Sequence, residues 1–343
     1  MFNNKCVLIT GAAGSIGSAL ADFIIQKKTS KLILLDNAET PLFKLEQVLR
    51  LKLPIVTQIE FVLGSITNKS LIEKLFANSK IDFVFHTAAY KHVPVLEKSP
   101  IPGVEVNCIG TKILADGAIK YNVKNFLFVS TDKAVEPANV MGATKLLAEK
   151  YIGALSKQYM QSTRFVTLRF GNVIGSNGSV IPLFKEQLLF NKKLTLTDVA
   201  ATRYFINVSK VVSLAIESLK FAISGSVFLI EMGAPKSILS IAKQTISELN
   251  LNEEQVDIEI IGLRPGEKLH ETLVGRQASL EKTEHPEIYL IKGTETLSFE
   301  EITEAFKTLQ NIVAQQNDIE VVQYLKSILK TFKSRNSEFE SLD

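Results

Sequence analysis

The stretch TGAAGSIG, residues 10–17, joins a short apolar run at 6–10 to a segment with helical periodicity at 18–26. Its glycines, Gly11, Gly14 and Gly17, are spaced three residues apart. Without Cβ atoms they let the chain turn tightly, let backbone N–H groups approach an anion, and let the helix pack closely on the strand. The N-terminus of that helix then faces the bound negative charge. The stretch therefore predicts a strand, an anion-binding turn and a helix in succession.

Apolar runs and helical patterns alternate through the first half of the chain. Strands are expected at 6–10, 31–36, 59–63, 81–86, 125–130 and 164–170, and helices at 18–26, 38–51, 71–77, 104–121 and 142–158. Strands that alternate with helices at this spacing form right-handed βαβ units and a parallel sheet. We therefore expect an α/β protein with a Rossmann-type doubly wound parallel sheet and a smaller C-terminal lobe.

The alternation loosens after Phe170, where Gly171, Gly175, Gly178 and Pro182 break the chain into loops. We expect residues 1–171 to form the nucleotide-binding domain with the catalytic residues. Residues 172–295 should form mainly a substrate-binding lobe, with some segments returning to the first domain, and 296–343 should form C-terminal helices and a polar tail. Within the last region, SFEE at 298–301 has capping-box spacing, a second amphipathic helix is expected at 319–332, and residues 334–343 should fray.

Asp36 ends the second expected strand, 19 residues beyond Gly17. A carboxylate there can accept hydrogen bonds from both hydroxyls of an adenosine ribose and repels a 2′-phosphate. The next residues, Asn37 and Ala38, are not arginines that could offset this repulsion. A tight turn without a ligand would not predict this acidic residue. The combination favours NAD over NADP as cofactor.

The amino-acid composition argues against several other classes of protein. Of 343 residues, 46% are hydrophobic and 22% are charged, which suits a chain with a large core and excludes a disordered one. A net charge of +3 is too small to argue for a nucleic-acid partner. Cys6 and Cys108 form neither a disulfide framework nor a zinc spacing, so no metal is expected. With no apparent signal peptide or membrane span, we expect a soluble, cytoplasmic protein.

Polar residues gather where the fifth expected strand ends and the next helix begins. Thr131, Asp132 and Lys133 close the strand, while Met141 and Lys145 lie one helical turn apart. In a doubly wound sheet, this edge forms the ligand crevice. Taken alone, Asp132 and Lys133 would be read as a solvated strand end and Met141 as a core residue.

Together these motifs resemble the extended short-chain dehydrogenase/reductase family. Within it, the chain is similar to bacterial UDP-N-acetylglucosamine 4,6-dehydratases of polysaccharide and glycan biosynthesis. Many members of this group carry an N-terminal membrane region and a further domain, whereas this chain resembles the soluble short form. The matching segments, spread over about the first 275 residues, are TGAAGSIGS (10–18), HTAAYKHVPVLEKSP (86–100), VSTDKAVEPANVMGATKLLAEKYI (129–152), LRFGNVIGSNGSVIPLF (168–184), TRYFI (202–206) and GLRPGEKLHETL (262–273).

The resemblance implies a lyase that oxidises C4 of a nucleotide-activated N-acetylhexosamine with NAD, eliminates water across C5 and C6, and returns the hydride to C6. UDP-N-acetylglucosamine is the expected substrate. The resemblance assigns Asp132 as the acid and Lys133 as the base of the elimination. Lys133 would then have to be neutral, and we expect burial beside Lys145 to lower its pKa. The pair should avoid a simple salt bridge, and the chain should turn here because strand alternation would separate the two side chains.

Met141 departs from the tyrosine that most of the family carries at this position, and a thioether cannot accept a proton. Thr131 can hydrogen-bond the 4-hydroxyl and Lys145 can anchor the nicotinamide ribose, but the base for the 4-hydroxyl stays open. Asn172 resembles a nucleotide-diphosphate ligand, and Arg203 and Arg264 are the expected diphosphate clamps. The implied cofactor contacts are Gly11, Ala13, Gly14, Ser15, Ile16, Gly17, Asp36, Ser65, Ile66, Ala88, Ala89, Lys91, Asn107 and Lys145; the implied substrate contacts are Lys91, His92, Asn172, Ser179, Val180, Arg203, Arg264 and Glu267.

Three other functions stay open at this point. A nucleotide-sugar 4-epimerase shares the fold and cofactor but usually keeps the tyrosine. A dehydratase that also inverts C5 has the same requirements as a simple one. A non-catalytic NAD-sensing module tolerates loss of the tyrosine but does not explain why Asp132, Lys133, Arg203 and Arg264 occur together. By analogy with related enzymes we expect a homo-oligomer, and the nucleotide base (UDP or GDP) and the pathway are left open.

Overall fold

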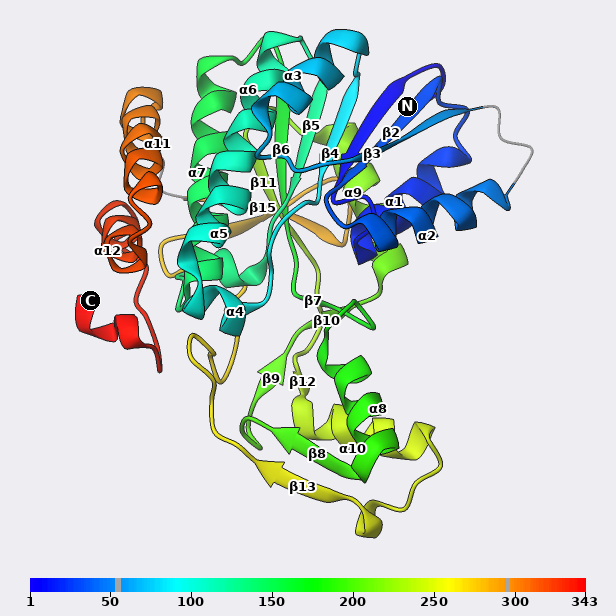
Figure 1. The fold of residues 1–343 in the computed structure, drawn as a ribbon, viewed down its shortest axis with the longest axis vertical. Coiled ribbons are helices and arrows are strands. Elements are labelled where there is room, and N and C mark those ends of the chain that lie inside the picture. The colour runs from blue at the N-terminus through cyan, green and yellow to red at the C-terminus, as the bar shows by residue number, and fades with distance from the viewer. Residues whose placement is uncertain (53–56, 294–296) are drawn as a thin grey trace.

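A computed structural model describes residues 1–52, 57–293 and 297–343 of the chain, and its centre is a twisted, mainly parallel sheet (Figure 1). Within these residues the strand order is β14-β15-β11-β6-β5-β4-β1-β2-β3. The strands from β11 to β3 run parallel, and β15 and β14 add antiparallel pairs at one edge. The strands are β1 (Cys6–Thr10), β2 (Lys31–Asp36), β3 (Gln58–Leu63), β4 (Phe83–His86), β5 (Asn125–Val129), β6 (Arg164–Arg169), β11 (Ser226–Ile230), β14 (Ser279–Lys282) and β15 (Ile288–Lys292). The predicted doubly wound fold is confirmed.

The strand order reverses between β1 and β4, which are hydrogen-bonded neighbours. Thr10 is paired with Leu35 on one side and with His86 on the other, so three strands end at the same level. Connections leave in opposite directions at such a point and open a crevice beyond the carboxyl ends of the strands. This topology places the glycine turn, which follows β1, at the mouth of the crevice.

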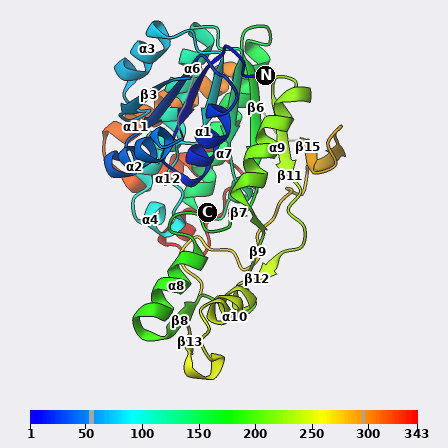
Figure 2. The same ribbon diagram turned by 90° about the vertical axis from the view of Figure 1, so that its right-hand side faces the viewer.

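Helices cover both faces of the sheet and enclose two apolar cores (Figure 2). One face carries α1 (Ser15–Ile25), α2 (Glu39–Arg50) and α9 (Val208–Phe221). The other side carries α3 (Lys69–Asn78), α6 (Thr111–Lys120), α7 (Val140–Gln158), α11 (Phe299–Ala314) and α12 (Asp318–Ile328). Because α7 lies between the sheet and α11, it is buried around most of its circumference. No helix within the described residues has the length and apolar character needed to cross a membrane.

A smaller lobe lies beyond the carboxyl edge of the sheet and has its own apolar cluster (Figure 1). The short pairing of β7 with β10 lies between the sheet and the lobe, and β9 pairs with β12 within the lobe (Figure 1). The predicted domain boundaries at 171 and 295 stay a prediction. The remaining elements that lie between β6 and β14 in the sequence are β7 (Asn172–Val173), α8 (Val180–Asn191), β8 (Lys193–Leu196), β9 (Thr202–Arg203), β10 (Phe205–Ile206), β12 (Lys236–Ser237), α10 (Ile238–Glu248), η3 (Glu253–Gln255) and β13 (Asp257–Ile260).

A helix is present at 104–121 as expected, but its expected start and its uniform α-helical geometry are wrong. The continuous helical segment begins at Pro100, and it consists of α5 (Pro100–Val104), the π-helical turn η1 (Glu105–Gly110) and α6 from Thr111; the short α4 (Val93–Lys98) precedes it. A π-turn adds a residue to the helical circuit, and here Asn107 lies fully buried within it. Apolar residues continue through both kinds of turn, so periodicity could not separate them.

The expected fraying of residues 334–343 is also wrong. Phe332 and Phe339 are 1% and 4% exposed, and the last residues form the turn η4 (Glu338–Leu342). The backbone N–H groups of Lys333 and Arg335 donate to the carbonyls of Pro137 (3.0 Å) and Ala138 (3.2 Å). Two buried rings and these hydrogen bonds hold a segment whose composition is mostly polar.

We predict that Phe339→Ala lowers the free energy of unfolding by roughly 3 kcal/mol, because it removes a buried ring and leaves a cavity. Denaturant unfolding measures this value. Phe190→Ala is the matched control: Phe190 is 91% exposed, so its loss should cost less than about 0.5 kcal/mol. Equal effects of the two substitutions would show that the C-terminal segment is not packed.

Candidate active site

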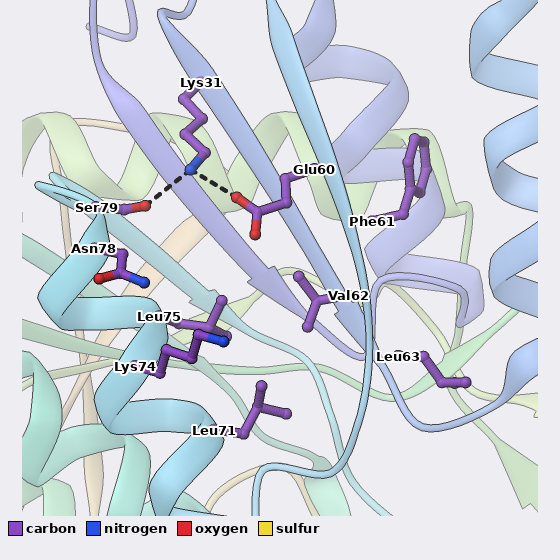
Figure 3. A pocket seen from close by; sticks show the side chains of 10 residues that line it. All are labelled: Lys31, Glu60, Phe61, Val62, Leu63, Leu71, Lys74, Leu75, Asn78 and Ser79. Carbon is purple, nitrogen blue, oxygen red and sulfur yellow. Dashed lines mark hydrogen bonds and ion pairs between the residues drawn. The ribbon is translucent and has the colours of Figure 1, made fainter.

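A small hollow of the described surface measures about 500 Å³ and lies between β3 and α3 (Figure 3). One of its two lysines, Lys31, contacts Glu60 at 2.6 Å and Ser79 at 2.9 Å. Because these three groups satisfy one another and none of the residues expected to bind a ligand lines this hollow, we place no site there.

A larger cavity, about 970 Å³, lies beyond the carboxyl ends of the central strands, and Arg203 and Glu267 on the side of the lobe line part of it. Most of the residues implicated from the sequence line this cavity, and they come from segments far apart in the chain. The structure brings together Gly11, Ala13, Gly14, Ser15, Ile16, Asp36, Ser65, Ile66, Ala88, Ala89, Lys91, His92, Thr131, Lys133, Met141, Lys145, Asn172, Ser179, Val180, Arg203, Arg264 and Glu267. It does not place Gly17, Asn107 or Asp132 on the wall.

The glycine turn passes so close to the end of β4 that a side chain would not fit. Gly11 has φ +66°, and a Cβ atom on it would lie 2.6 Å from the amide nitrogen of Ala88. A Cβ atom on Gly17 would lie 2.1 Å from the carbonyl oxygen of Gly11. Gly17 thus packs α1 onto the turn instead of touching a ligand. These contacts leave the turn's backbone exposed to the cavity.

The turn and Asp36 together fit a dinucleotide. Helix α1 begins directly after Gly14, three residues earlier than expected, and no side chain caps its first N–H groups. Those groups and the helix dipole attract an anion. Asp36 accepts hydrogen bonds from Ala13 N (2.8 Å) and Ala38 N (2.9 Å), which fix its carboxylate at the cavity wall.

Asn107, expected to contact a cofactor, has a structural role instead. Its side chain accepts from Tyr90 N (2.8 Å) and donates to Tyr90 O (2.9 Å) and to Thr144 Oγ1 (3.0 Å). These bonds occupy the amide and fix the loop after β4. Asn107 therefore shapes the wall without facing the cavity.

The chain turns at the end of β5, as the sequence requires. Residues Asp132–Ala134 form the 3-10 turn η2, and Thr131 stands at its N-terminus. The Thr131 hydroxyl faces the cavity and donates to Asp132 Oδ1 at 2.9 Å. Asp132 itself is completely buried behind Thr131 and Lys133. A ligand in the cavity therefore reaches Thr131 and Lys133 before it reaches Asp132.

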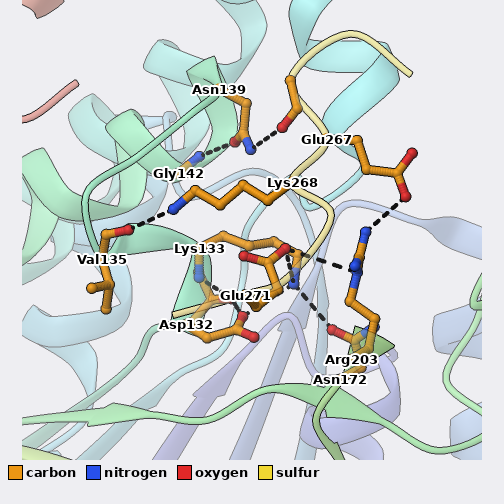
Figure 4. A network of polar contacts seen from close by, with 12 residues as sticks. Asp132, Lys133, Val135, Asn139, Gly142, Asn172, Arg203, Glu267, Lys268 and Glu271 are labelled. Atoms are coloured by element: carbon orange, nitrogen blue, oxygen red, sulfur yellow. Dashed lines mark hydrogen bonds and ion pairs between the residues drawn. The ribbon is translucent and has the colours of Figure 1, made fainter. Parts of the chain in front are cut away.

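Lys133 lies at the centre of a network of polar contacts (Figure 4). Its ammonium contacts Asp132 Oδ1 at 3.1 Å, Asn172 Oδ1 at 3.0 Å and Glu271 Oε1 at 3.7 Å. Burial lowers the pKa of Lys133, but the charges of Asp132 and Glu271 outweigh burial and raise this pKa above its usual range. The expectations of a lowered pKa and of a separated Asp132–Lys133 pair are therefore both wrong for the protein without ligands.

The second lysine of the site, Lys145, behaves in the opposite way. It is buried on α7 beside Met141, donates to Val129 O at 2.7 Å and lies 3.9 Å from the centre of the Phe128 ring. Burial lowers the pKa of Lys145 to about 7, against the opposing charge of Glu149. Glu149 is itself paired with Arg169, so within residues 1–52, 57–293 and 297–343 no carboxylate forms an ion pair with Lys145.

The lobe contributes a group of charges around Arg203. The guanidinium donates to Thr202 O (2.7 Å), Leu269 O (3.1 Å) and Glu267 Oε1 (2.7 Å). Its Nε lies 3.9 Å from Glu271 Oε1. Glu267, which the resemblance implies as a substrate contact, thus pairs with an arginine of the same cavity. Arg264 lies exposed at the rim of the cavity.

A glycine-framed loop before α8 covers part of the cavity. Lys91 donates to Asn177 O at 2.8 Å, and Asn177 N donates to Ser15 Oγ at 3.1 Å. Burial and the charge of Lys133 lower the pKa of Lys91. The His92 ring packs against Gly178, and burial and Lys91 lower its pKa. The loop therefore joins the glycine turn to the segment after β4.

Buried polar atoms without a hydrogen-bond partner concentrate at this cavity. Within the described residues they include Ser130 Oγ, Asp132 Oδ2, Ser179 Oγ and Glu271 Oε2. Unsatisfied buried groups are rare because each costs free energy, so their clustering indicates a place that a ligand completes. Sequence reasoning assigned no role to Ser130 or Glu271. Both residues lie within the sequence segments that resemble the dehydratases, but only their burial without a hydrogen-bond partner sets them apart from the residues around them.

Comparison with known proteins gives the family. The sequence profile described as "Polysaccharide biosynthesis protein" matches residues 7–293. The chain belongs to this polysaccharide biosynthesis protein family. The match covers the sheet domain and the lobe and ends before α11.

Relatives within the family carry more than one activity in their names. The capsular polysaccharide biosynthesis protein CapD of Staphylococcus aureus is 40% identical over 288 residues, 83% of this chain and 48% of CapD. The chain thus spans about half the length of that relative. A UDP-N-acetylglucosamine 4,6-dehydratase (inverting) of Campylobacter jejuni and a UDP-glucose 4-epimerase of Rickettsia canadensis are each 32% identical, over 81% of this chain and 80% of theirs.

A solved structure has the same architecture. The X-ray structure of Pen from Bacillus thuringiensis superposes with a TM-score of 0.77 at 32% identity and covers 90% of this chain and 99% of that chain. The likeness extends over both the sheet and the lobe. The two proteins therefore share their fold over most of the chain, and not only at the glycine turn.

We predict that Lys145→Met raises the free energy of unfolding of the ligand-free protein at pH 7. Between pH 10.5 and about 7 the unfolded chain binds a proton at Lys145 that the folded chain does not. Stability therefore falls as the pH is lowered through this window, by on the order of 3 kcal/mol. Lys145→Met should remove that part of the pH dependence, measured by denaturant unfolding at pH 7 and pH 10. Lys330→Met, at an exposed site, is the control, and an equal effect there would contradict a depressed pKa at Lys145.

Proposed function

We propose that this family member is an NAD-dependent 4,6-dehydratase of a nucleotide-activated N-acetylhexosamine, with UDP-N-acetylglucosamine as its substrate. The observation that carries the proposal is the hydrogen-bonded series Thr131–Asp132–Lys133, in which Thr131 and Lys133 line the cavity together with Met141 and Asp132 lies buried behind them. The relative named as a dehydratase supports the reaction class.

The glycine turn and Asp36 would hold NAD, which when bound accepts a hydride from C4 of the sugar and later returns it to C6. Gly14 and Ser15 at the start of α1 would face the pyrophosphate, and Asp36 would bind the adenosine ribose. Lys145 would lie beside the nicotinamide ribose. Arg203, Arg264 and Asn172 would hold the nucleotide diphosphate from the lobe side.

The contacts of Thr131 supply a route for the first proton, which Met141 cannot accept. Thr131 Oγ1 donates to Asp132 Oδ1, so a proton released by the 4-hydroxyl can reach the aspartate through this hydroxyl. The same route returns the proton to the C6 hydroxyl when it leaves as water. Lys133, after its ammonium group has released a proton to solvent, removes the C5 proton and gives it back to C5 as the hydride reaches C6. From that state on, protons balance within three adjacent residues.

The proposed reaction predicts a specific product. Incubation of the purified protein with UDP-N-acetylglucosamine and NAD should yield a nucleotide sugar lighter by one water molecule, seen by mass spectrometry, with a 6-methyl group and a 4-ketone seen by NMR. The NMR spectrum also gives the C5 configuration. Bound NAD without turnover of UDP- or GDP-linked hexosamines would instead support a sensing module.

We predict that Lys133→Ala abolishes dehydration, with a rate loss of at least about 100-fold, because no other neutral base would remain beside Asn172. NAD affinity should be unchanged, since Lys133 lies away from the glycine turn. Product formation is followed by mass and NAD binding by calorimetry. Near-normal turnover of the variant would show that Lys133 is not the base of the elimination.

A 4-epimerase is the second candidate, because a relative with that name is as similar as the dehydratase. An epimerase returns the hydride to C4, so its product has the mass of the substrate and a new C4 configuration. Epimerisation does not need an acid for the C6 hydroxyl. It therefore does not explain why Thr131, Asp132 and Lys133 form a hydrogen-bonded series. The same incubation separates the two activities.

A further inference from the structure

Glu271 lies on the wall of the cavity and has no assigned role. Its side chain is 4% exposed. One oxygen, Oε1, lies 3.7 Å from Lys133 Nζ and 3.9 Å from Arg203 Nε. The other, Oε2, is buried without a hydrogen-bond partner among the described residues. A carboxylate buried in this way is costly, so a purely structural role gives no reason for an acid at this position.

The segment that carries Glu271 is fixed along its length. Lys268 Nζ donates to Val135 O (3.0 Å) and Glu136 O (2.8 Å), just after the turn that holds Lys133. Thr202 N donates to Leu269 O at 3.1 Å, beside Arg203. The same two elements that carry Lys133 and Arg203 therefore position the carboxylate between them, as Figure 4 shows.

The charges that face Lys133 come from four elements. Asp132 lies on its own turn and Glu271 on the 266–271 segment, and both favour the ammonium. Arg203 on β9 and Lys91 after β4 oppose it. Lys268 faces Glu271 and Asp132 from the side, and Asn172 adds an uncharged acceptor. The two carboxylates thus keep Lys133 protonated although Arg203 and Lys91 lie nearby.

We propose that Glu271 is a positioning residue that keeps Lys133 as an ammonium beside Asn172 until substrate is bound, and so sets the pH at which this lysine becomes a base. The inference rests on the proposed function, in which neutral Lys133 removes the C5 proton. A neutral amine is the active form, so activity rises with pH through the Lys133 titration. Glu271 moves that rise to higher pH.

The test measures the protonation of Lys133 directly. In protein labelled with 13C at the lysine Cε, the Lys133 signal is assigned by its loss in Lys133→Met and followed against pH. In Glu271→Gln, which keeps the size of the side chain, the titration should move to lower pH by about one unit or more. The acidic limb of kcat/KM should move by the same amount and in the same direction.

Glu267→Gln is the matched control. Glu267 pairs with Arg203 at 2.7 Å and with Thr197 at 3.0 Å, so its substitution also removes a carboxylate from the lobe. It should alter UDP affinity, measured by calorimetry, while the Lys133 titration stays in place. Denaturant unfolding of both variants shows that each is folded.

The outcomes separate the two proposals. A Lys133 titration that stays unchanged in Glu271→Gln overturns the role of Glu271, as does an equal shift in both variants. The NMR titration needs no turnover. If the wild type forms no dehydrated product, the proposed function fails while the protonation experiment still decides the role of Glu271.

Discussion

The close approach of Gly11 to the end of β4 is the constraint on which the rest of the site depends. A Cβ atom at Gly11 would overlap the backbone at Ala88, so the absence of a side chain lets β1 and β4 remain neighbours up to their last residues. That pairing sets the point where the strand order reverses. The crevice beyond it takes the loops after β1, β2, β4 and β5, and each supplies part of the cavity wall.

Buried charge distinguishes this cavity from the two cores. Arg169 and Glu149 are buried together with two hydrogen bonds between them, which compensates each charge. Among the described residues Lys145, one turn from Glu149 on α7, is buried without such an ion pair, and its pKa falls to about 7. Lys133 has two carboxylates and keeps its proton. The two lysines of the cavity wall therefore differ in charge near neutral pH, because burial favours the neutral amine of Lys145 and the carboxylates favour the ammonium of Lys133.

The lobe and the C-terminal segment act on the site through backbone contacts. Gly266, with φ +75°, donates from its amide to Arg335 O at 2.7 Å and accepts from Asn139 Nδ2 at 2.8 Å. Asn139 also caps α7, the helix of Met141 and Lys145. A segment near the end of the chain thus fixes the loop of Arg264 and Glu267 against α7. Phe339, with Phe332 before it, anchors that mostly polar segment in the core.

The sequence by itself determined the parallel sheet, the turn at residues 10–17 and Asp36 at the end of β2, because glycine spacing, apolar runs and an acidic strand end are local signals. It also predicted that Thr131, Lys133 and Met141 share one edge of the sheet, since Thr131 and Lys133 follow the end of β5 and Met141 lies in the first turn of the next helix, α7. Only the tertiary structure decided that Asp132 is buried behind Thr131, that Asn107 and Gly17 support the wall, and that Glu271 faces Lys133. The contact of Glu271 with Lys133 joins residues more than 100 positions apart, and the hydrogen bonds of Asn107 join three separate segments, so no local pattern records them.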